Sequence, residues 1–128
     1  MARYLASLYR SGMGGDEKRV VDAFVAWLQE EGWTAETEVN FADVFARRGD
    51  ERLYAEAKGR TAAIGLDVDT LYGQLLRRMT DPDAGVRYAV VVPATAVLAA
   101  LRVPDWVRQR LRIDVYEVDD GGQVHIQE

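Results

Sequence analysis

The chain has 128 residues, of which 48% are hydrophobic and 29% charged, and this length and balance predict one soluble globular domain. It contains no cysteine, which excludes disulfides and thiolate metal sites and agrees with the cytoplasmic location that we expect. The net charge of −5 argues against indiscriminate nucleic-acid binding, and no apolar run approaches the roughly 18 residues of a membrane span.

The first 31 residues predict two helices separated by glycines. Residues 1–14 are apolar and aromatic, and we expect a short helix that docks either on the domain, which we assign to residues 15–128, or on another subunit. From about Asp16 to Glu31, apolar residues recur at helical spacing. Glu17 falls on this apolar stripe, so it either complements the positive N-terminus of the helix or points into a site.

The stretch 41–58 predicts a β-hairpin that carries charged residues where a core would be expected. Its arms, 41–48 and 51–58, alternate in polarity and are joined by Gly49-Asp50, which suits a turn. A preceding strand over 33–40 completes a meander. Alternation places Phe41, Asp43 and Phe45 on one face of the first arm, and Tyr54, Glu56 and Lys58 on one face of the second.

If the two arms pair, Asp43, Glu56 and Lys58 converge at the end of the hairpin away from its turn. Two carboxylates held close together repel each other unless one binds a proton or a cation lies between them. Mg²⁺ prefers oxygen ligands and is often held by only one or two carboxylates. We therefore interpret Asp43 and Glu56 as ligands of a divalent ion and Lys58 as the group that orients or activates a water for attack on a phosphodiester.

The spacing of Asp43 and Glu56-Ala57-Lys58, with twelve residues between Asp43 and Glu56, resembles the PD-(D/E)xK nuclease superfamily, which has the restriction-endonuclease-like fold. Ala42 stands where the superfamily's name places a proline, a departure that is frequent in it. The resemblance covers residues 15–120. It implies an α/β mixed sheet with helices on both faces.

The resemblance also implies an activity and a ligand set. The expected activity is Mg²⁺- or Mn²⁺-dependent hydrolysis of nucleic acid, DNA in first place, by an endonuclease or an exonuclease. Asp43, Glu56 and the backbone carbonyl of Ala57 would hold the metal. In the superfamily, an acidic residue on the first helix and a glutamine on the helix after the lysine strand support the site, which gives these roles to Glu17 and Gln74.

The remainder of the chain predicts alternating helices and strands. A helix over 67–80 carries Gln74 off its apolar stripe, and Gly73 would let this helix approach the sheet closely. A helix between two strands favours a parallel crossover to the buried strand 87–92. The C-terminal part predicts a short helix over 95–101, a helix over 105–111 with Trp106 buried and Arg108 exposed, a strand over 113–118, an edge strand over 123–127, and a structural role for His125.

Basic residues near the predicted site offer contacts to nucleic acid. Arg60 and Thr61 follow the lysine strand, and Arg77 and Arg78 follow Gln74. The alternative is that these side chains are simply solvated.

Two other functions compete with the nuclease. One is a catalytically silent domain of the same fold that binds nucleic acid or a protein partner, which the acidic net charge favours. The other is a purely structural ion pair between Asp43 and Lys58, although buried pairs are seldom net stabilising.

Glu36 and Glu38 are rival site acids that are more typical of a solvated strand edge. A single site cuts one strand, so cleavage of a duplex would need a homodimer, and no membrane is expected as a partner.

Overall fold

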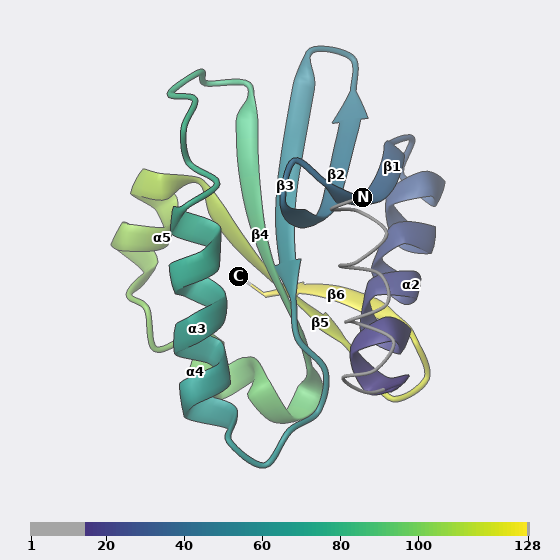
Figure 1. Ribbon diagram of the computed structural model, residues 1–128, viewed down its shortest axis with the longest axis vertical. Coiled ribbons are helices and arrows are strands. Elements are labelled where there is room, and N and C mark those ends of the chain that lie inside the picture. The colour runs from purple at the N-terminus through teal and green to yellow at the C-terminus, as the bar shows by residue number, and fades with distance from the viewer. Residues whose placement is uncertain (1–14, 128) are drawn as a thin grey trace.

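A six-stranded mixed sheet forms the middle layer of the molecule (Figure 1). The computed structural model describes residues 15–127, so the helix predicted within residues 1–14 lies outside the described part. The strands lie side by side in chain order: β1 (Thr34–Val39), β2 (Ala42–Arg48), β3 (Glu51–Ala57), β4 (Val86–Pro93), β5 (Ile113–Val118) and β6 (Val124–Gln127).

The directions of the strands divide the sheet into a meander and a parallel half. β1, β2 and β3 are antiparallel neighbours, β3, β4 and β5 are parallel, and β6 closes the far edge in the antiparallel direction. The predicted hairpin, the parallel crossover and the central position of the Val-rich strand are confirmed. β4 is buried along most of its length because helices cover both of its faces.

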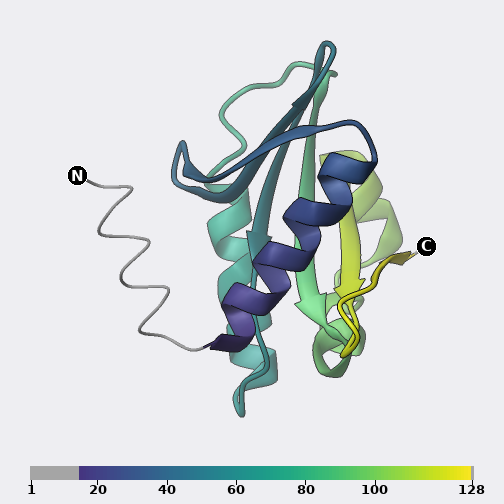
Figure 2. The same ribbon diagram turned by 90° about the vertical axis from the view of Figure 1, so that its right-hand side faces the viewer.

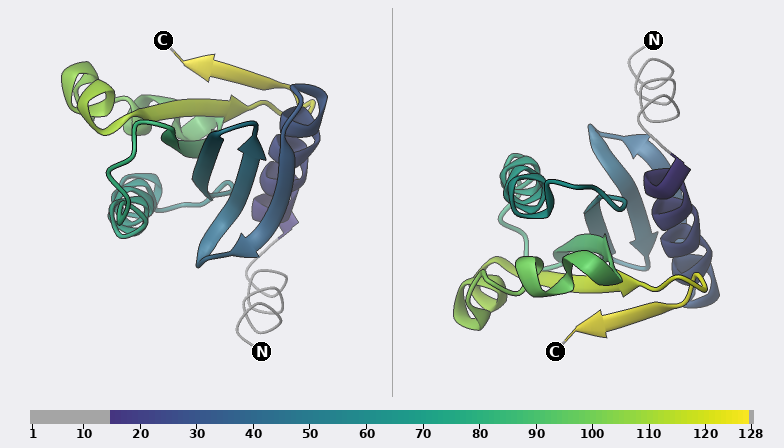
Figure 3. Two further views of the ribbon diagram at one scale, coloured as in Figure 1. Left: turned by 90° about the horizontal axis from the view of Figure 1, so that it is seen from above. Right: turned by 90° about the horizontal axis from the view of Figure 1, so that it is seen from below.

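Helices cover both faces of the sheet, as predicted (Figures 1 and 3). α2 (Gly15–Glu30) packs on one face through Val20, Phe24 and Leu28, against alternate residues of β2, β3 and β4. α3 (Ile64–Leu76) and α4 (Val97–Ala100), which follows the 3₁₀ turn η1 (Ala94–Ala96), pack on the other face. α5 (Asp105–Leu111) leads into β5. No helix within residues 15–127 has the length and apolar character that a membrane span requires.

The two turns of the meander differ in their backbone conformation. Gly49 takes φ of 60° in the β2–β3 turn, which glycine adopts without a side-chain clash. The β1–β2 turn instead places Asn40 and Phe41 at φ of 56° and 65°. The alternation of the sequence predicts Phe41 within the strand, on the face of Asp43. This prediction is wrong, because Phe41 lies in the turn and 80% of its surface is exposed.

Three further predictions are corrected by the structure. α3 ends at Leu76 rather than at Thr80. A Cβ atom on Gly73 would meet no atom within 4 Å, so this glycine does not mark a close approach to the sheet. In α5, Trp106 is 63% exposed and Arg108 is buried, because the guanidinium donates to the carbonyl of Val103 at 2.9 Å and pairs with Asp105.

Candidate active site

Asp43 and Glu56 meet on the face of the sheet that α3 covers. The register of β2 and β3 pairs Phe45 with Tyr54; Asp43 lies two residues before Phe45 and Glu56 two residues after Tyr54, on the same face. Oδ2 of Asp43 accepts a hydrogen bond of 2.8 Å from the backbone N–H of Ala57, and the carboxyl groups of Asp43 and Glu56 are hydrogen-bonded to each other. The two acids therefore converge where alternation placed them.

Glu56 is an almost completely buried acid, with 3% of its surface exposed. Burial raises the pKa of its carboxyl group to about 8, and the negative charge of Asp43 and the hydrogen bond between the two groups act in the same direction. The guanidinium of Arg78 opposes this rise without cancelling it. Without a bound cation, the Asp43–Glu56 pair therefore favours a form in which the two carboxyl groups share a proton.

Arg78 reaches Glu56 from the turn that follows α3. Its Nε donates to Oε1 of Glu56 at 3.0 Å, and its Cζ lies 5.9 Å from the centre of the Phe41 ring. The sequence suggested a contact to nucleic acid for Arg78 but gave no signal of the contact to Glu56. That contact depends on where α3 ends. The helix ends at Leu76, and Arg78, the second residue after it, lies in the turn that returns toward the sheet.

Lys58 directly follows β3, and its backbone N–H continues the parallel ladder by donating to the carbonyl of Val91 at 3.0 Å. Lys58 and Glu17 line a cavity of about 150 Å³ together with five neighbours: Asp16, Gly59, Arg60, Thr61 and Asp67. The structure thus brings Glu17, predicted as a supporting acid, beside Lys58.

The close contact of α2 with the end of β3 places Glu17 in this cavity. A Cβ atom on Gly59 would lie 2.3 Å from the backbone nitrogen of Glu17, so only glycine fits there without a shift of the backbone. Asp16 accepts a hydrogen bond from the backbone N–H of Arg60 and forms an ion pair of 2.9 Å with Arg19. The glycine directly after Lys58 is the signal in the sequence that could have predicted this close contact.

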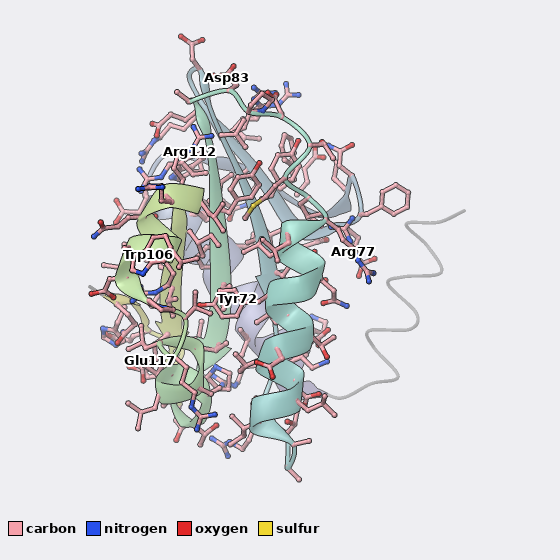
Figure 4. The ribbon with its side chains drawn as sticks, turned by 90° about the vertical axis from the view of Figure 1, so that its left-hand side faces the viewer. Tyr72, Arg77, Asp83, Trp106, Arg112 and Glu117 are labelled. Carbon is pink, nitrogen blue, oxygen red and sulfur yellow. The ribbon has the colours of Figure 1, made fainter. Side chains whose placement is uncertain are left out.

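The other predicted residues lie either in the Lys58 cavity or near the end of α3. Gln74 is exposed, and Arg78 rather than Gln74 is the residue from the α3 end that contacts Glu56. Arg60 pairs with Asp120 at 2.6 Å, and the hydroxyl of Thr61 donates to Asp67. Arg77 is exposed at the C-terminal end of α3 (Figure 4).

The oxygen ligands available to a metal are few. Within residues 15–127, no group of three or more His, Cys, Asp or Glu side chains is placed to hold an ion. Asp43 and Glu56 form a pair, and Mg²⁺ needs no more than one or two carboxylates because it keeps several of its waters. A proton shared by two neighbouring acids is one that a divalent ion can replace. The donor set therefore fits such an ion.

Comparisons with known proteins support the fold. No protein-family model matches the chain, and no curated protein is similar in sequence. The chain is similar in structure to an XisH family protein from Nostoc punctiforme, with a TM-score of 0.59 and 16% identity over 86% of this chain and 99% of that one. It is also similar to a FdxN element excision controlling factor protein from Anabaena variabilis, with a TM-score of 0.58 and 15% identity over 84% and 96% of the two chains. At these identities the likeness shows the fold alone.

Proposed function

We propose that the protein is a metal-dependent nuclease that hydrolyses phosphodiester bonds of DNA, with the restriction-endonuclease-like fold that the resemblance implies. The observation that carries this proposal is the pair of hydrogen-bonded carboxyl groups, Asp43 on β2 and Glu56 on β3, at the ends of neighbouring strands. Burial of two acids together is unfavourable in the folded domain by itself, because each disfavours the charged form of the other. A cation that binds between them would remove this penalty.

Asp43 and Glu56 would hold Mg²⁺ or Mn²⁺, with the backbone carbonyl of Ala57 as a third oxygen ligand. A bound ion would polarise the scissile phosphate and lower the pKa of a water ligand. The backbone N–H of Ala57 donates to Oδ2 of Asp43 and so fixes the orientation of this carboxylate before an ion binds. The buried position of Glu56 keeps bulk water from competing at its oxygens.

Lys58 and its cavity supply the remaining groups of the reaction. The amino group of Lys58 orients the attacking water or accepts its proton. Glu17, in the same cavity, supports the position of Lys58 and of the water. Arg78 is close enough to Glu56 for its guanidinium to stabilise negative charge that develops on the phosphate, so it assists the reaction from the α3 side.

A catalytically silent domain is the second candidate, and one contact favours it. The guanidinium of Arg78 lies 3.0 Å from Oε1 of Glu56 and already compensates part of the charge that an ion would compensate. In such a protein the acids and Arg78 would form a closed network, no divalent ion would bind, and the domain would serve to bind nucleic acid or a protein partner.

Metal binding and cleavage, measured on the same variants, distinguish the two candidates. We expect calorimetry to detect Mn²⁺ binding to the wild type, and Mn²⁺ or Mg²⁺ to support cleavage of labelled oligonucleotides or plasmid to products with 5′-phosphates. Asp43→Asn should abolish both. Lys58→Ala should retain ion binding but lower the cleavage rate at least about 100-fold, the usual effect of removing a general acid or base.

A carboxylate outside the site provides the control. Asp22 lies on the exposed side of α2 with 59% of its side chain accessible, and Asp22→Asn should leave ion binding and cleavage unchanged. Full activity of Asp43→Asn or of Lys58→Ala would refute the assignment. Absence of ion binding in the wild type, together with retained binding of a partner, would establish the silent domain instead.

A further inference from the structure

The turn between β1 and β2 holds an aromatic side chain outside the domain in an unfavourable backbone conformation. Asn40 and Phe41 in the turn have φ of 56° and 65°, and Glu38 near the end of β1 has φ of 59°. Asn tolerates this conformation, whereas for Glu and Phe it costs of the order of 1 kcal/mol or more each. The turn projects from the body of the molecule (Figure 2), and burial does not compensate this energy, since 80% of the Phe41 surface is exposed.

Phe41 lines a cavity of about 320 Å³ together with aromatic, basic and polar side chains. The other lining residues are Asn40, Tyr54, Arg77, Arg78 and Thr80. The cavity thus combines aromatic rings for a base, guanidinium groups for a phosphate, and amide and hydroxyl groups for hydrogen bonds. We call this cavity the Phe41 pocket. Figure 4 shows Arg77 at the outer surface, at the end of α3, where a phosphate has free access.

The Phe41 pocket adjoins the carboxyl pair through Arg78. Cζ of Arg78 lies 5.9 Å from the centre of the Phe41 ring, and Nε of the same side chain donates to Oε1 of Glu56. Tyr54 lines the pocket and lies two residues before Glu56 on β3, on the same face of the sheet. A nucleotide bound in the pocket would therefore lie beside the candidate active site.

We propose that the Phe41 pocket binds an unpaired nucleotide that neighbours the cleaved phosphodiester, with its base stacked on Phe41 and its phosphate on Arg77. The bases inside a duplex are covered on both faces by their neighbours, so an exposed ring can stack only on an unpaired or terminal base. The net charge of −5 disfavours attraction of a long duplex by charge alone, which increases the relative weight of stacking. Single strands or frayed ends are accordingly the preferred substrates. The identity of the cleaved bond rests on the proposed function, whereas the binding of the nucleotide does not.

Binding without cleavage tests the pocket. Fluorescence anisotropy is measured in EDTA with a short fluorescein-labelled single strand and with the blunt duplex of the same sequence. Phe41→Ala should weaken single-strand binding about 10-fold, within the range for the loss of one base–aromatic stack, while Phe41→Trp should restore it. Leu98→Ala, an equally exposed apolar residue on α4, is the matched control and should change nothing.

The outcomes separate the pocket from the nuclease. The proposed nucleotide binding is refuted if Phe41→Ala binds the single strand as well as Leu98→Ala does. It is also refuted if Phe41→Ala loses affinity for the duplex and the single strand equally, or if the wild type does not prefer the single strand. Cleavage in Mn²⁺ is assayed separately. Loss of single-strand binding in Phe41→Ala supports the pocket even if the wild type cleaves nothing, and cleavage by the wild type with normal binding by Phe41→Ala supports the nuclease and refutes the pocket.

Discussion

The two faces of the β2–β3 hairpin differ in what they carry, although their residues alternate along the same two strands. Toward α2, the hairpin presents Val44, Ala46 and Ala55, which are fully buried in an apolar core. Toward α3, it presents Asp43 and Glu56, a hydrogen-bonded acid pair. The α2 face contributes only hydrophobic burial to stability. The α3 face combines the aromatic pair Phe45 and Tyr54 with two acids whose charge Arg78 compensates in part. Substitutions on the two faces should therefore affect different properties.

The largest difference between the faces is expected for two adjacent residues of β2. Asp43→Asn should lower the cleavage rate more than about 100-fold, since the loss of a residue that only hydrogen-bonds to a metal ligand already costs about 10–100-fold. Its stability should hold, because the amide oxygen can still accept from the N–H of Ala57. Val44→Ala should instead lower the free energy of unfolding by about 2 kcal/mol and leave the activity per folded molecule unchanged. Urea titration measures the stability of each variant, and initial rates measure its cleavage activity. If either variant lost both stability and activity, the two faces would not have the separate roles that we expect.

The next effect concerns how tightly α2 lies against the sheet. Gly59→Ala should lower the free energy of unfolding by about 3 kcal/mol, the upper part of the range for overpacking, because the added Cβ would meet the backbone of Glu17 rather than a flexible side chain. The shift would also move Glu17 away from Lys58, so the cleavage rate should fall as well. Thermal unfolding followed by circular dichroism measures the first effect. An unchanged melting temperature would show that the end of β3 does not contact α2 so closely.

The sequence predicted the acid pair because its geometry follows from local rules. Side chains in a strand alternate with a period of two, and the short turn at Gly49 fixes the register of the hairpin, so Asp43 and Glu56 had to share a face. Glu17 was harder to place, because its position depends on the contact between Gly59 and α2.

The features that were missed depend on where elements end or on how a short helix is rotated. No glycine or proline follows Leu76 directly, so the end of α3, and with it the contact of Arg78 to Glu56, left no local signal. The β1–β2 turn lacks glycine, so Phe41 was assigned to a strand although Asn40 tolerates the turn conformation. α5 has only seven residues, too few for its periodicity to decide between Trp106 and Arg108 as the buried residue.

A pH-dependent effect, about 1 kcal/mol per pH unit, is expected from the proton that the Asp43–Glu56 pair binds in metal-free protein. The pKa of Glu56 is about 8 in the folded state, against 4.5 for the unperturbed carboxyl group. Between these values the folded state binds a proton that the unfolded state has released, so stability decreases as the pH rises and levels off above about pH 8. In the Glu56→Gln variant this side chain does not titrate, so its free energy of unfolding should change little over the same pH range.

Urea unfolding in EDTA from about pH 5 to pH 8.5, with the wild-type curve taken relative to that of Glu56→Gln, isolates this contribution from other titrating groups. Saturating Mn²⁺ should flatten the wild-type curve, because the ion replaces the proton between the acids. If stability changed with pH in the same way for both proteins in EDTA, the environment on the α3 side would leave Glu56 charged. The contrast between the two faces would then be smaller than the structure indicates.

The smallest effect has the opposite sign to that of Gly59→Ala and concerns the helix on the other side. Gly73 lies within α3, and a Cβ atom there would meet no atom within 4 Å. Gly73→Ala should therefore raise the free energy of unfolding by about 0.5–1 kcal/mol, because alanine loses less backbone entropy than glycine when the helix forms. A melting temperature that rises for Gly73→Ala and falls for Gly59→Ala would show that α2 is held tightly against the strand end beside Lys58, whereas α3 leaves room along its middle. A loss of stability in Gly73→Ala would place α3 closer to the sheet and would restore the tight packing that the sequence predicted there.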